Sequence, residues 1–265
     1  MQIPSVVCRN RLALMSLVHF EFDQNLRDLL PSGHPSEAVP VEFTGPQSAK
    51  HLLEALGIPH TEIRTVVRGN QNLGLSYLPA DGDVLEVAGI NSQTMLDEPR
   101  FILDGHLGRL AAGLRMLGLD CAYENQAADA NLARVACREN RVLLSRDRRL
   151  LMRKAVTQGY LVRSLEPDAQ LTAVCLRFDL LRWFLPFRRC MRCNSLLQPA
   201  AKSSVVDRLL PLTRRYYDVF RVCRNCSNIY WAGSHMAAMH AKIDRLCEVL
   251  RGTVPQSNRL DDGRS

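Results

Sequence analysis

Residues 100–117 read RFILDGHLGRLAAGLRML, and the fold of the central part of the chain is predicted from this stretch. Residues 100–103 form a short apolar run of strand character that ends at Asp104. Apolar residues then recur at helical spacing and would share one helical face: Leu107, Leu110, Ala111, Leu114 and Leu117. The stretch therefore predicts a strand that leads directly into an amphipathic helix.

The same alternation continues toward the C-terminus. Further strands are expected over residues 120–123, 141–144 and 160–162. Helices are expected over residues 129–139, 147–156 and 167–178. Short strands that alternate with short helices are typical of βαβ units on a parallel sheet. We therefore expect a parallel α/β domain over residues 98–183.

Three aspartates are expected at one edge of this sheet. Asp104 follows the first strand, Asp129 begins the helix after the second, and Asp147 follows the third. Because the carboxyl ends of parallel strands meet at one edge, these carboxylates should cluster and bind Mg²⁺ or Mn²⁺. Each is also a favoured helix N-cap, so that alternative stays open. Asp120 should lie at the opposite edge, and Asp168 is a candidate for a fourth acid or an ordinary helix start.

The net charge of +7 is divided unevenly along the chain. Residues 18–98 carry twelve Asp/Glu and four Lys/Arg, whereas residues 134–192 carry five Asp/Glu and fourteen Lys/Arg. A basic surface suited to a polyanion is therefore expected in the second half, with a merely solvated face as the alternative. Arg115, Arg146 and Arg148 are candidates for binding phosphate, and salt bridges with nearby acids are the competing interpretation.

Four of the nine cysteines form two C-x-x-C pairs: Cys190, Cys193, Cys223 and Cys226. Two such pairs can close a tetrahedron of thiolates around Zn²⁺, and four protein ligands leave no open position, so the zinc should be structural. An Fe–S cluster and a dithiol redox pair are the alternatives. The long spacer between the pairs favours a zinc ribbon over residues 186–243, including a following helix.

The N-terminal block has a different pattern. Strands are expected over residues 18–22, 39–43, 65–67 and 84–87, with a helix over residues 48–56. This order predicts a compact α+β domain over residues 18–92.

The two ends of the chain are expected to lie outside these domains. We expect residues 1–17 to be a loosely ordered leader and residues 251–265 a disordered tail. No apolar run is long enough to span a membrane, and no signal peptide is evident, so a cytoplasmic protein is expected.

The central and C-terminal motifs resemble the Mut-seven C-terminal RNase domain family, a PIN-like nuclease fold fused to a zinc ribbon. The likeness covers about residues 98–243 and rests on FILDGHLG from Phe101, LLSRD ending at Asp147, RCMRCN from Arg189 and CRNCSNIYWAGSH from Cys223. It implies metal-dependent RNA cleavage, with Asp104, Asp129 and Asp147 as the metal-binding acids. Ser145 stands where threonine is common in that family.

Residues 51–62, HLLEALGIPHTE, resemble the ubiquitin-like, β-grasp domain that often precedes this RNase domain. Sulfur carriers of that fold end in a free Gly-Gly. Here the corresponding strand continues from Val87 to Ile90 and into the next domain, so thiocarboxylate chemistry is not expected.

The leading hypothesis is a metal-dependent ribonuclease with catalytic Mg²⁺ or Mn²⁺, structural zinc and a structured, tRNA-like RNA as substrate. A non-catalytic RNA-binding module is the second hypothesis. A protein-interaction scaffold, with the acidic N-terminal domain recruiting a protein partner, is the third.

Overall fold

The computed structural model describes residues 15–31, 38–91 and 93–253. The chain divides into two compact units, residues 1–91 and residues 92–265. The expected leader and tail lie mostly outside the described residues, but their predicted limits were wrong: the first strand begins at Met15, and the last helix runs to Thr253. No helix in the described ranges is long and apolar enough to span a bilayer.

The N-terminal domain is a five-stranded sheet with the strand order β2-β1-β5-β3-β4. Its strands are β1 (Met15–Phe22), β2 (Ala38–Thr44), β3 (Ile63–Arg68), β4 (Gln71–Asn72) and β5 (Val84–Gly89). Its helices are α1 (Gln24–Arg27), α2 (Ala49–Ala55) and the 3₁₀ turn His60–Glu62. β1 is antiparallel to β2 and parallel to β5, which is the β-grasp arrangement.

Local sequence explains where α2 begins and which of its faces is buried. Ser48 caps the helix by accepting a hydrogen bond from the backbone N–H of His51. Leu52 and Leu53 are buried, and their spacing from Ala49 gives the helix one apolar face. The predicted α+β domain is confirmed.

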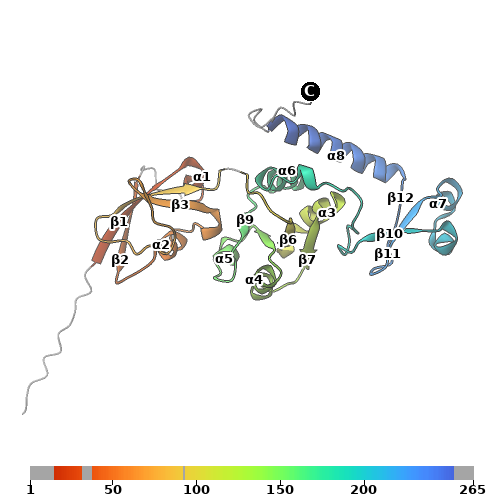
Figure 1. The fold of residues 1–265 in the computed structure, drawn as a ribbon. Helices are drawn as coiled ribbons and strands as arrows, with labels where there is room; N and C mark the ends of the chain where they lie inside the picture. Colours follow the sequence, from red (N-terminus) through yellow and green to blue (C-terminus); the bar gives the residue numbers. More distant parts are fainter. Residues whose placement is uncertain (1–14, 32–37, 92, 254–265) are drawn as a thin grey trace, which may run out of the picture. The chain divides into compact units, whose positions relative to one another are not determined.

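The central domain contains a four-stranded sheet in which all neighbouring strands are parallel. Its strands are β6 (Arg100–Leu103), β7 (Asp120–Tyr123), β8 (Val142–Ser145) and β9 (Gly159–Leu161), in the order β7-β6-β8-β9. Its helices are α3 (Gly108–Met116), α4 (Asp129–Arg138), α5 (Arg148–Leu151) and α6 (Pro167–Arg177), and 3₁₀ turns span Gly105–Leu107 and Leu181–Trp183. α3 and α6 lie on one side of the sheet and α4 on the other (Figure 1).

The parallel α/β prediction is confirmed, with one correction. The helix expected over residues 147–156 is only one turn long, because α5 ends at Leu151. Leu150 and Leu151 are buried, and the chain then turns so that Val156 is buried as well before β9 begins.

The C-terminal part forms a ribbon, residues 186–233, followed by a long helix. The ribbon has an antiparallel sheet of β10 (Leu197–Ala200), β11 (Phe220–Cys223) and β12 (Ile229–Trp231), the short helix α7 (Pro211–Tyr216) and 3₁₀ turns at Lys202–Ser204 and Val206–Arg208. The helix α8 (Ser234–Thr253) returns to the central domain, where Ile243, Leu246 and Leu250 join its core. The second half of α8 therefore belongs to the central core.

The connection between central domain and ribbon is held by backbone contacts. Leu185 N–H and Phe187 N–H donate to the carbonyls of Leu117 and Met116 at the end of α3. Gly118, with φ +90°, makes this possible, since a Cβ there would lie 2.1 Å from the carbonyl oxygen of Leu185.

Asp120, at the amino end of β7, also ties the ribbon to the central domain. Its carboxylate pairs with Arg141 and Arg189 and accepts a hydrogen bond from the Asn194 side chain. Burial acts to raise the pKa of Asp120, but the hydrogen bonds from Arg141 and Asn194 outweigh it, and the net pKa is lowered. Because Asp120 begins β7 whereas Asp104 follows the end of the parallel strand β6, the two acids lie at opposite edges of the sheet, as predicted.

Candidate active site and metal centre

Asp104 lies at the carboxyl end of β6 and is only 6% exposed. Its Oδ1 accepts a hydrogen bond from the N–H of His106, which makes it the cap of the turn that follows. Its Oδ2 accepts from the hydroxyl of Ser145 and from the N–H of Arg146, both at the end of the neighbouring strand β8. Three donors thus hold this carboxylate in one orientation.

Asp147 is connected to Asp104 through a single side chain. The buried Ser145 Oγ donates to Asp104 Oδ2 at 2.5 Å and accepts from the N–H of Asp147 at 2.8 Å. Asp147 in turn caps α5, because its Oδ1 accepts from the N–H of Arg149. In the strand order β7-β6-β8-β9, the chain leads outward from β6 to β7 on one side and from β8 to β9 on the other, so the switch point of the sheet lies between β6 and β8. Ligands of open α/β sheets bind in the crevice at such a switch point.

Asp129 differs from the other two acids because it caps nothing. The N-cap of α4 is Ala128, which makes no side-chain capping bond, and Asp129 is the first helical residue. Its side chain is 48% exposed and pairs with Arg153 at 3.8 Å. The cap interpretation therefore holds for Asp104 and Asp147 but not for Asp129.

The three acids do not form a closed cluster. Among the residues that the structure describes, four cysteines alone bring three or more ligand atoms within 4.8 Å of one another. Asp104 is held by its three donors, whereas Asp129 and Asp147 are exposed. The fit of these residues to a divalent cation is therefore partial. Asp168 is paired with Lys242 on α8.

A close approach of two loops shapes the same edge. The Tyr123 hydroxyl donates to the carbonyl of Gly105 and lies 3.0 Å from Asn125 Oδ1. A Cβ on Gly105 would lie 2.4 Å from the Asn125 carbonyl oxygen, so only glycine allows this contact directly after Asp104. Tyr123 and Asn125 were missed by sequence reasoning, and Gly105 beside a strand-terminal acid was the available signal.

The prediction that Arg115 binds phosphate was wrong. Arg115 is 3% exposed, and its guanidinium donates to the backbone carbonyls of Cys121, Met191 and Arg192. It therefore joins α3 and β7 to the ribbon. Arg146 is exposed and Arg148 partly exposed, both directly beside the acidic edge.

A basic hollow of about 620 Å³ lies between α4 and the segment that follows α5. Four basic side chains line it: Arg134, Arg138, Arg153 and Lys154. Since Arg153 also pairs with Asp129, the hollow begins at the acidic edge. The charge of residues 134–154 indicated a basic surface, but only the fold brings α4 and this segment together.

The four predicted zinc ligands are brought together in the ribbon. The Sγ atoms of Cys190 and Cys226 are 3.5 Å apart, and those of Cys193 and Cys223 are 3.3 Å apart. All four Sγ atoms lie within 4.8 Å of one another. This donor set fits a metal ion such as zinc, which four thiolates bind tetrahedrally.

The two C-x-x-C turns have the same backbone geometry. In each, the residue after the second cysteine has positive φ, 71° at Asn194 and 60° at Ser227. The N–H of each donates to the carbonyl of the first cysteine, Cys190 or Cys223. Asparagine and serine take a backbone conformation for which glycine is the default, so composition gave no hint of it.

The pKa values of two thiols in the cluster are shifted in opposite directions. Burial acts to raise the pKa of Cys193, but hydrogen bonds from Ser195 and Asn225 outweigh it and lower the pKa to about 5. Burial, followed by the neighbouring thiols, raises the pKa of Cys226 to about 12. Four thiolates this close repel one another, and a bound metal ion offsets that repulsion.

Comparison with protein families matches the two parts of the chain separately. Residues 15–94 match the family model described as Mut7-C ubiquitin, and residues 99–243 match the model described as Mut7-C RNAse domain. Neither the curated proteins nor the solved structures gave a match. The RNase-domain match covers more than half of the chain and includes the acidic edge and all four cysteines, and the chain therefore belongs to the Mut7-C RNAse domain family, with a Mut7-C ubiquitin domain in front.

Proposed function

We propose that this protein is a metal-dependent ribonuclease and that its active site is the edge formed by Asp104, Asp129 and Asp147. The observation that carries the proposal is the Asp104–Ser145–Asp147 connection at the switch point of the parallel sheet. Membership of the Mut7-C RNAse domain family supports the same reaction class.

The residues of this edge have separable roles. Asp104, held by three donors, offers a carboxylate in a set direction. Asp129 and Asp147 are exposed and would complete a site for Mg²⁺ or Mn²⁺, ions that supply an activated water and stabilise charge on the phosphate. Hydrolysis adds water at phosphorus and breaks the bond to the 3′ oxygen, leaving 5′-phosphate and 3′-hydroxyl ends.

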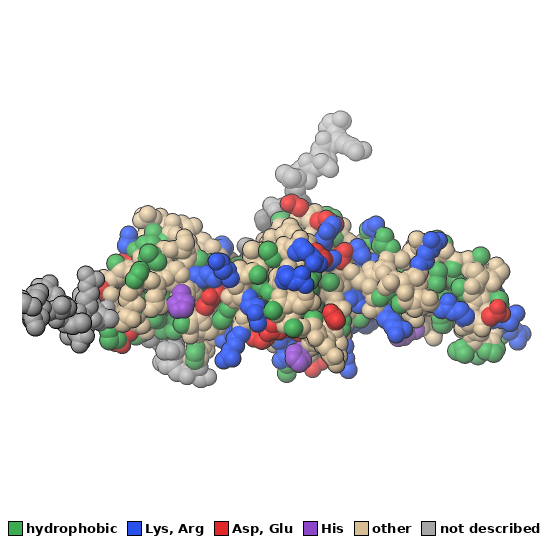
Figure 2. All heavy atoms as spheres, turned by 90° about the horizontal axis from the view of Figure 1, so that it is seen from below, with side chains coloured by type: hydrophobic (Ala, Val, Ile, Leu, Met, Phe, Trp, Pro, Cys, Tyr) green, Lys and Arg blue, Asp and Glu red, His purple; other side chains and the backbone are tan. Residues whose placement is uncertain are grey.

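Basic surfaces beside this edge would hold the RNA backbone. The basic hollow, together with Arg146 and Arg148, offers cations to phosphates next to the acids. The ribbon adds nine Lys/Arg against two Asp/Glu over residues 186–233. On the face drawn in Figure 2, Lys and Arg side chains are spread over the central domain and the ribbon. In this proposal the thiolate cluster holds zinc and keeps the ribbon folded.

The proposal is tested by measuring the cleavage of labelled RNA, including a folded tRNA-like transcript. The protein is first freed of loosely bound divalent ions. Cleavage is expected only after Mn²⁺ or Mg²⁺ is added, and phosphatase treatment should show that the new 5′ ends carry phosphate. Cleavage that needs no divalent ion, or products with 2′,3′-cyclic phosphates, would contradict a metal-activated water.

A non-catalytic RNA-binding module is favoured by one observation, the capping roles of Asp104 and Asp147. Under that alternative, RNA binds in a salt-dependent way and stays intact at every metal concentration. The acidic N-terminal domain, which the ribonuclease proposal does not use, would serve in either case to recruit a protein partner.

Ser145 provides a specific test of how the two acids are positioned. Ser145→Ala removes the hydroxyl that joins Asp104 to Asp147, and we expect cleavage to fall by about 10- to 100-fold, the usual loss for a supporting partner of a metal ligand. Ser145→Thr keeps the hydroxyl and should retain most activity. The measurement is the cleavage rate against Mn²⁺ concentration, and equal activity of the two variants would show that the hydroxyl positions nothing.

A further inference from the structure

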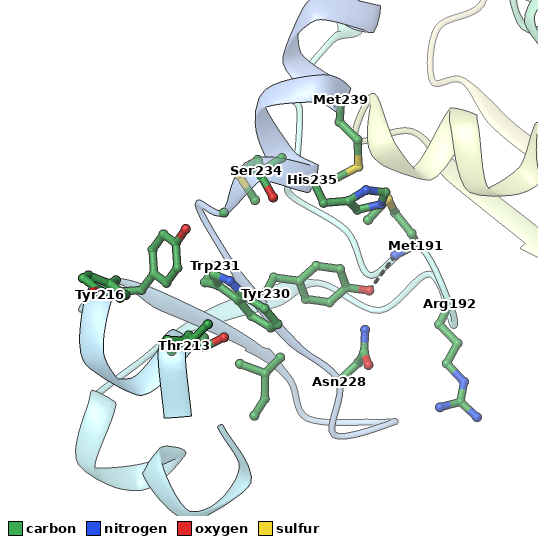
Figure 3. A pocket seen from close by; sticks show the side chains of 15 residues that line it. Met191, Arg192, Thr213, Tyr216, Asn228, Tyr230, Trp231, Ser234, His235 and Met239 are labelled. Atoms are coloured by element: carbon green, nitrogen blue, oxygen red, sulfur yellow. Dashed lines mark hydrogen bonds between the residues drawn. The ribbon is translucent and has the colours of Figure 1, made fainter. Parts of the chain in front are cut away.

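The ribbon contains an aromatic pocket of about 680 Å³ that lies between α7, β12 and the first turns of α8 (Figure 3). Four aromatic side chains line it: Tyr216, Tyr217, Tyr230 and Trp231. Its volume is within the range of small-ligand sites, about 300–1,000 Å³. The acidic edge is built from other residues, so this pocket is a separate site.

The walls of the aromatic pocket are fixed by the ribbon. The Tyr230 hydroxyl accepts from the N–H of Met191 at 3.2 Å and lies 3.1 Å from the Sγ of Cys190 (Figure 3). Gly233 leaves room for the indole, because a Cβ there would lie 2.9 Å from Trp231 Nε1. Two aromatic rings are thus held in place by the cysteine cluster and by the turn before α8.

Tyr216 forms an outer wall that remains open to solvent. It is 63% exposed although it is a large aromatic residue. The guanidinium of Arg215 lies over its ring, 5.3 Å from the ring centroid. An exposed ring beside an arginine is an arrangement suited to stacking a planar group.

The surroundings of the aromatic pocket indicate the charge of its ligand. Arg192 and His235 are the basic side chains that line it, and the ribbon as a whole has the excess of basic residues already described. Asn228, Thr213 and Ser234 add hydrogen-bonding groups to an otherwise apolar lining. A planar ring with a polar edge and an attached anion would match the aromatic walls, the hydrogen-bonding groups and the basic surroundings of the pocket.

We propose that the aromatic pocket takes an unpaired nucleobase of single-stranded RNA, whose phosphates lie on the basic residues of the ribbon; this deepens the proposed ribonuclease function and rests on it. Unstacked bases bind to aromatic side chains and expose their edges to hydrogen-bonding groups. A base inside a duplex must first be unpaired and unstacked, which costs free energy. The ribbon therefore selects RNA that has an unpaired segment, while the acidic edge performs the cut.

The test uses the full chain carrying Asp104→Asn, so that RNA stays intact, and measures affinity by fluorescence anisotropy. Two probes of equal length, about 12 nucleotides, are compared: oligouridine and an abasic strand with the same ribose-phosphate backbone. Tyr216→Ala and Trp231→Leu each remove an aromatic wall. Leu210→Ala is the matched control, because Leu210 is 73% exposed just before α7 and does not line the pocket.

Each wall variant is expected to bind oligouridine about tenfold more weakly, the loss of one stacked base, with affinity for the abasic strand unchanged. Leu210→Ala should match the parent protein on both probes. Metal content equal to that of the parent protein shows that the ribbon remains folded, which matters for the half-buried Trp231.

Failure of this inference is distinguishable from failure of the proposed function. If the parent protein binds both probes equally, or if the wall variants lose both probes equally, no base enters the pocket even though the wild-type chain cuts RNA. If the parent protein binds neither probe and the wild-type chain cuts no RNA, the ribonuclease proposal fails together with this one.

Discussion

Asp104→Asn should reduce RNA cleavage by at least about 10²–10³-fold, the loss typical when one charge-stabilising group of an active site is removed, and should leave RNA affinity near that of the wild type. Asp104 is the one acid of the edge that is both buried and held by three donors. The asparagine amide has nearly the same shape but one acceptor oxygen fewer. It would bind a divalent cation much more weakly than a carboxylate does.

The same substitution should also lower stability. An amide nitrogen would face either the N–H of His106 or the donors of Ser145 and Arg146, and a buried donor left without an acceptor costs about 1–3 kcal/mol. Thermal unfolding therefore has to be recorded beside cleavage and binding. A folded variant with lost cleavage and intact binding is the expected combination.

Asp97→Asn is the matched control for charge. Asp97 is exposed and precedes β6 at the amino end of the sheet, away from the acidic edge. The Asp97→Asn substitution removes the same charge as Asp104→Asn but away from the acidic edge, so the cleavage rate and RNA affinity of this variant should equal those of the wild type. Wild-type cleavage by folded Asp104→Asn protein would place the chemistry elsewhere.

Cys223→Ser should release the metal and unfold the ribbon. The buried cluster at the heart of the ribbon consists of Cys190, Cys223 and Leu197, with the other two cysteines and Tyr230 packed against it. The ribbon also buries Val205 and Phe220, so the metal site is a large part of a small core. Structural zinc typically contributes about 10–16 kcal/mol in domains of this kind. We expect substoichiometric metal, rapid proteolysis within residues 186–233 and loss of the ribbon's share of RNA affinity.

The central domain should survive this substitution, because its large apolar core is formed by β6, β8, α3 and α6 without the cysteine cluster. Cys137→Ser is the control for metal content and proteolysis, since Cys137 is exposed on α4 and outside the cluster. Elemental analysis of the wild type decides between the metals: zinc supports the proposal, and iron with sulfide would establish the Fe–S alternative. A Cys223→Ser protein with full metal content and an unchanged proteolysis pattern would contradict the assignment of Cys223 as a ligand.

Periodic and short-range patterns could be read directly from the sequence. The alternation of strands and helices from Arg100 onward, the helix start at Ser48 and the two C-x-x-C turns each depend on residues only a few positions apart. The order of the acids along the strands also followed, because every parallel strand presents its carboxyl end to the same edge. These features predict the three domains, the four cysteines and the three aspartates.

The tertiary structure decided which side chains actually meet, because those contacts join residues far apart in the chain. Ser145 bridges Asp104 from 41 positions away, and Arg115 reaches the ribbon backbone 76 and 77 positions away, which turns a presumed phosphate ligand into a structural residue. The aromatic pocket likewise gathers Met191, Tyr216, Tyr230 and Met236 from separate segments. Local sequence sets backbone conformation, whereas burial and hydrogen-bond partners depend on the folded arrangement of distant segments. The placement of Asp104 and Asp147 after neighbouring strands was therefore predictable, whereas the lack of a closed cluster with Asp129, the bridging hydroxyl, the basic hollow and the aromatic pocket were not.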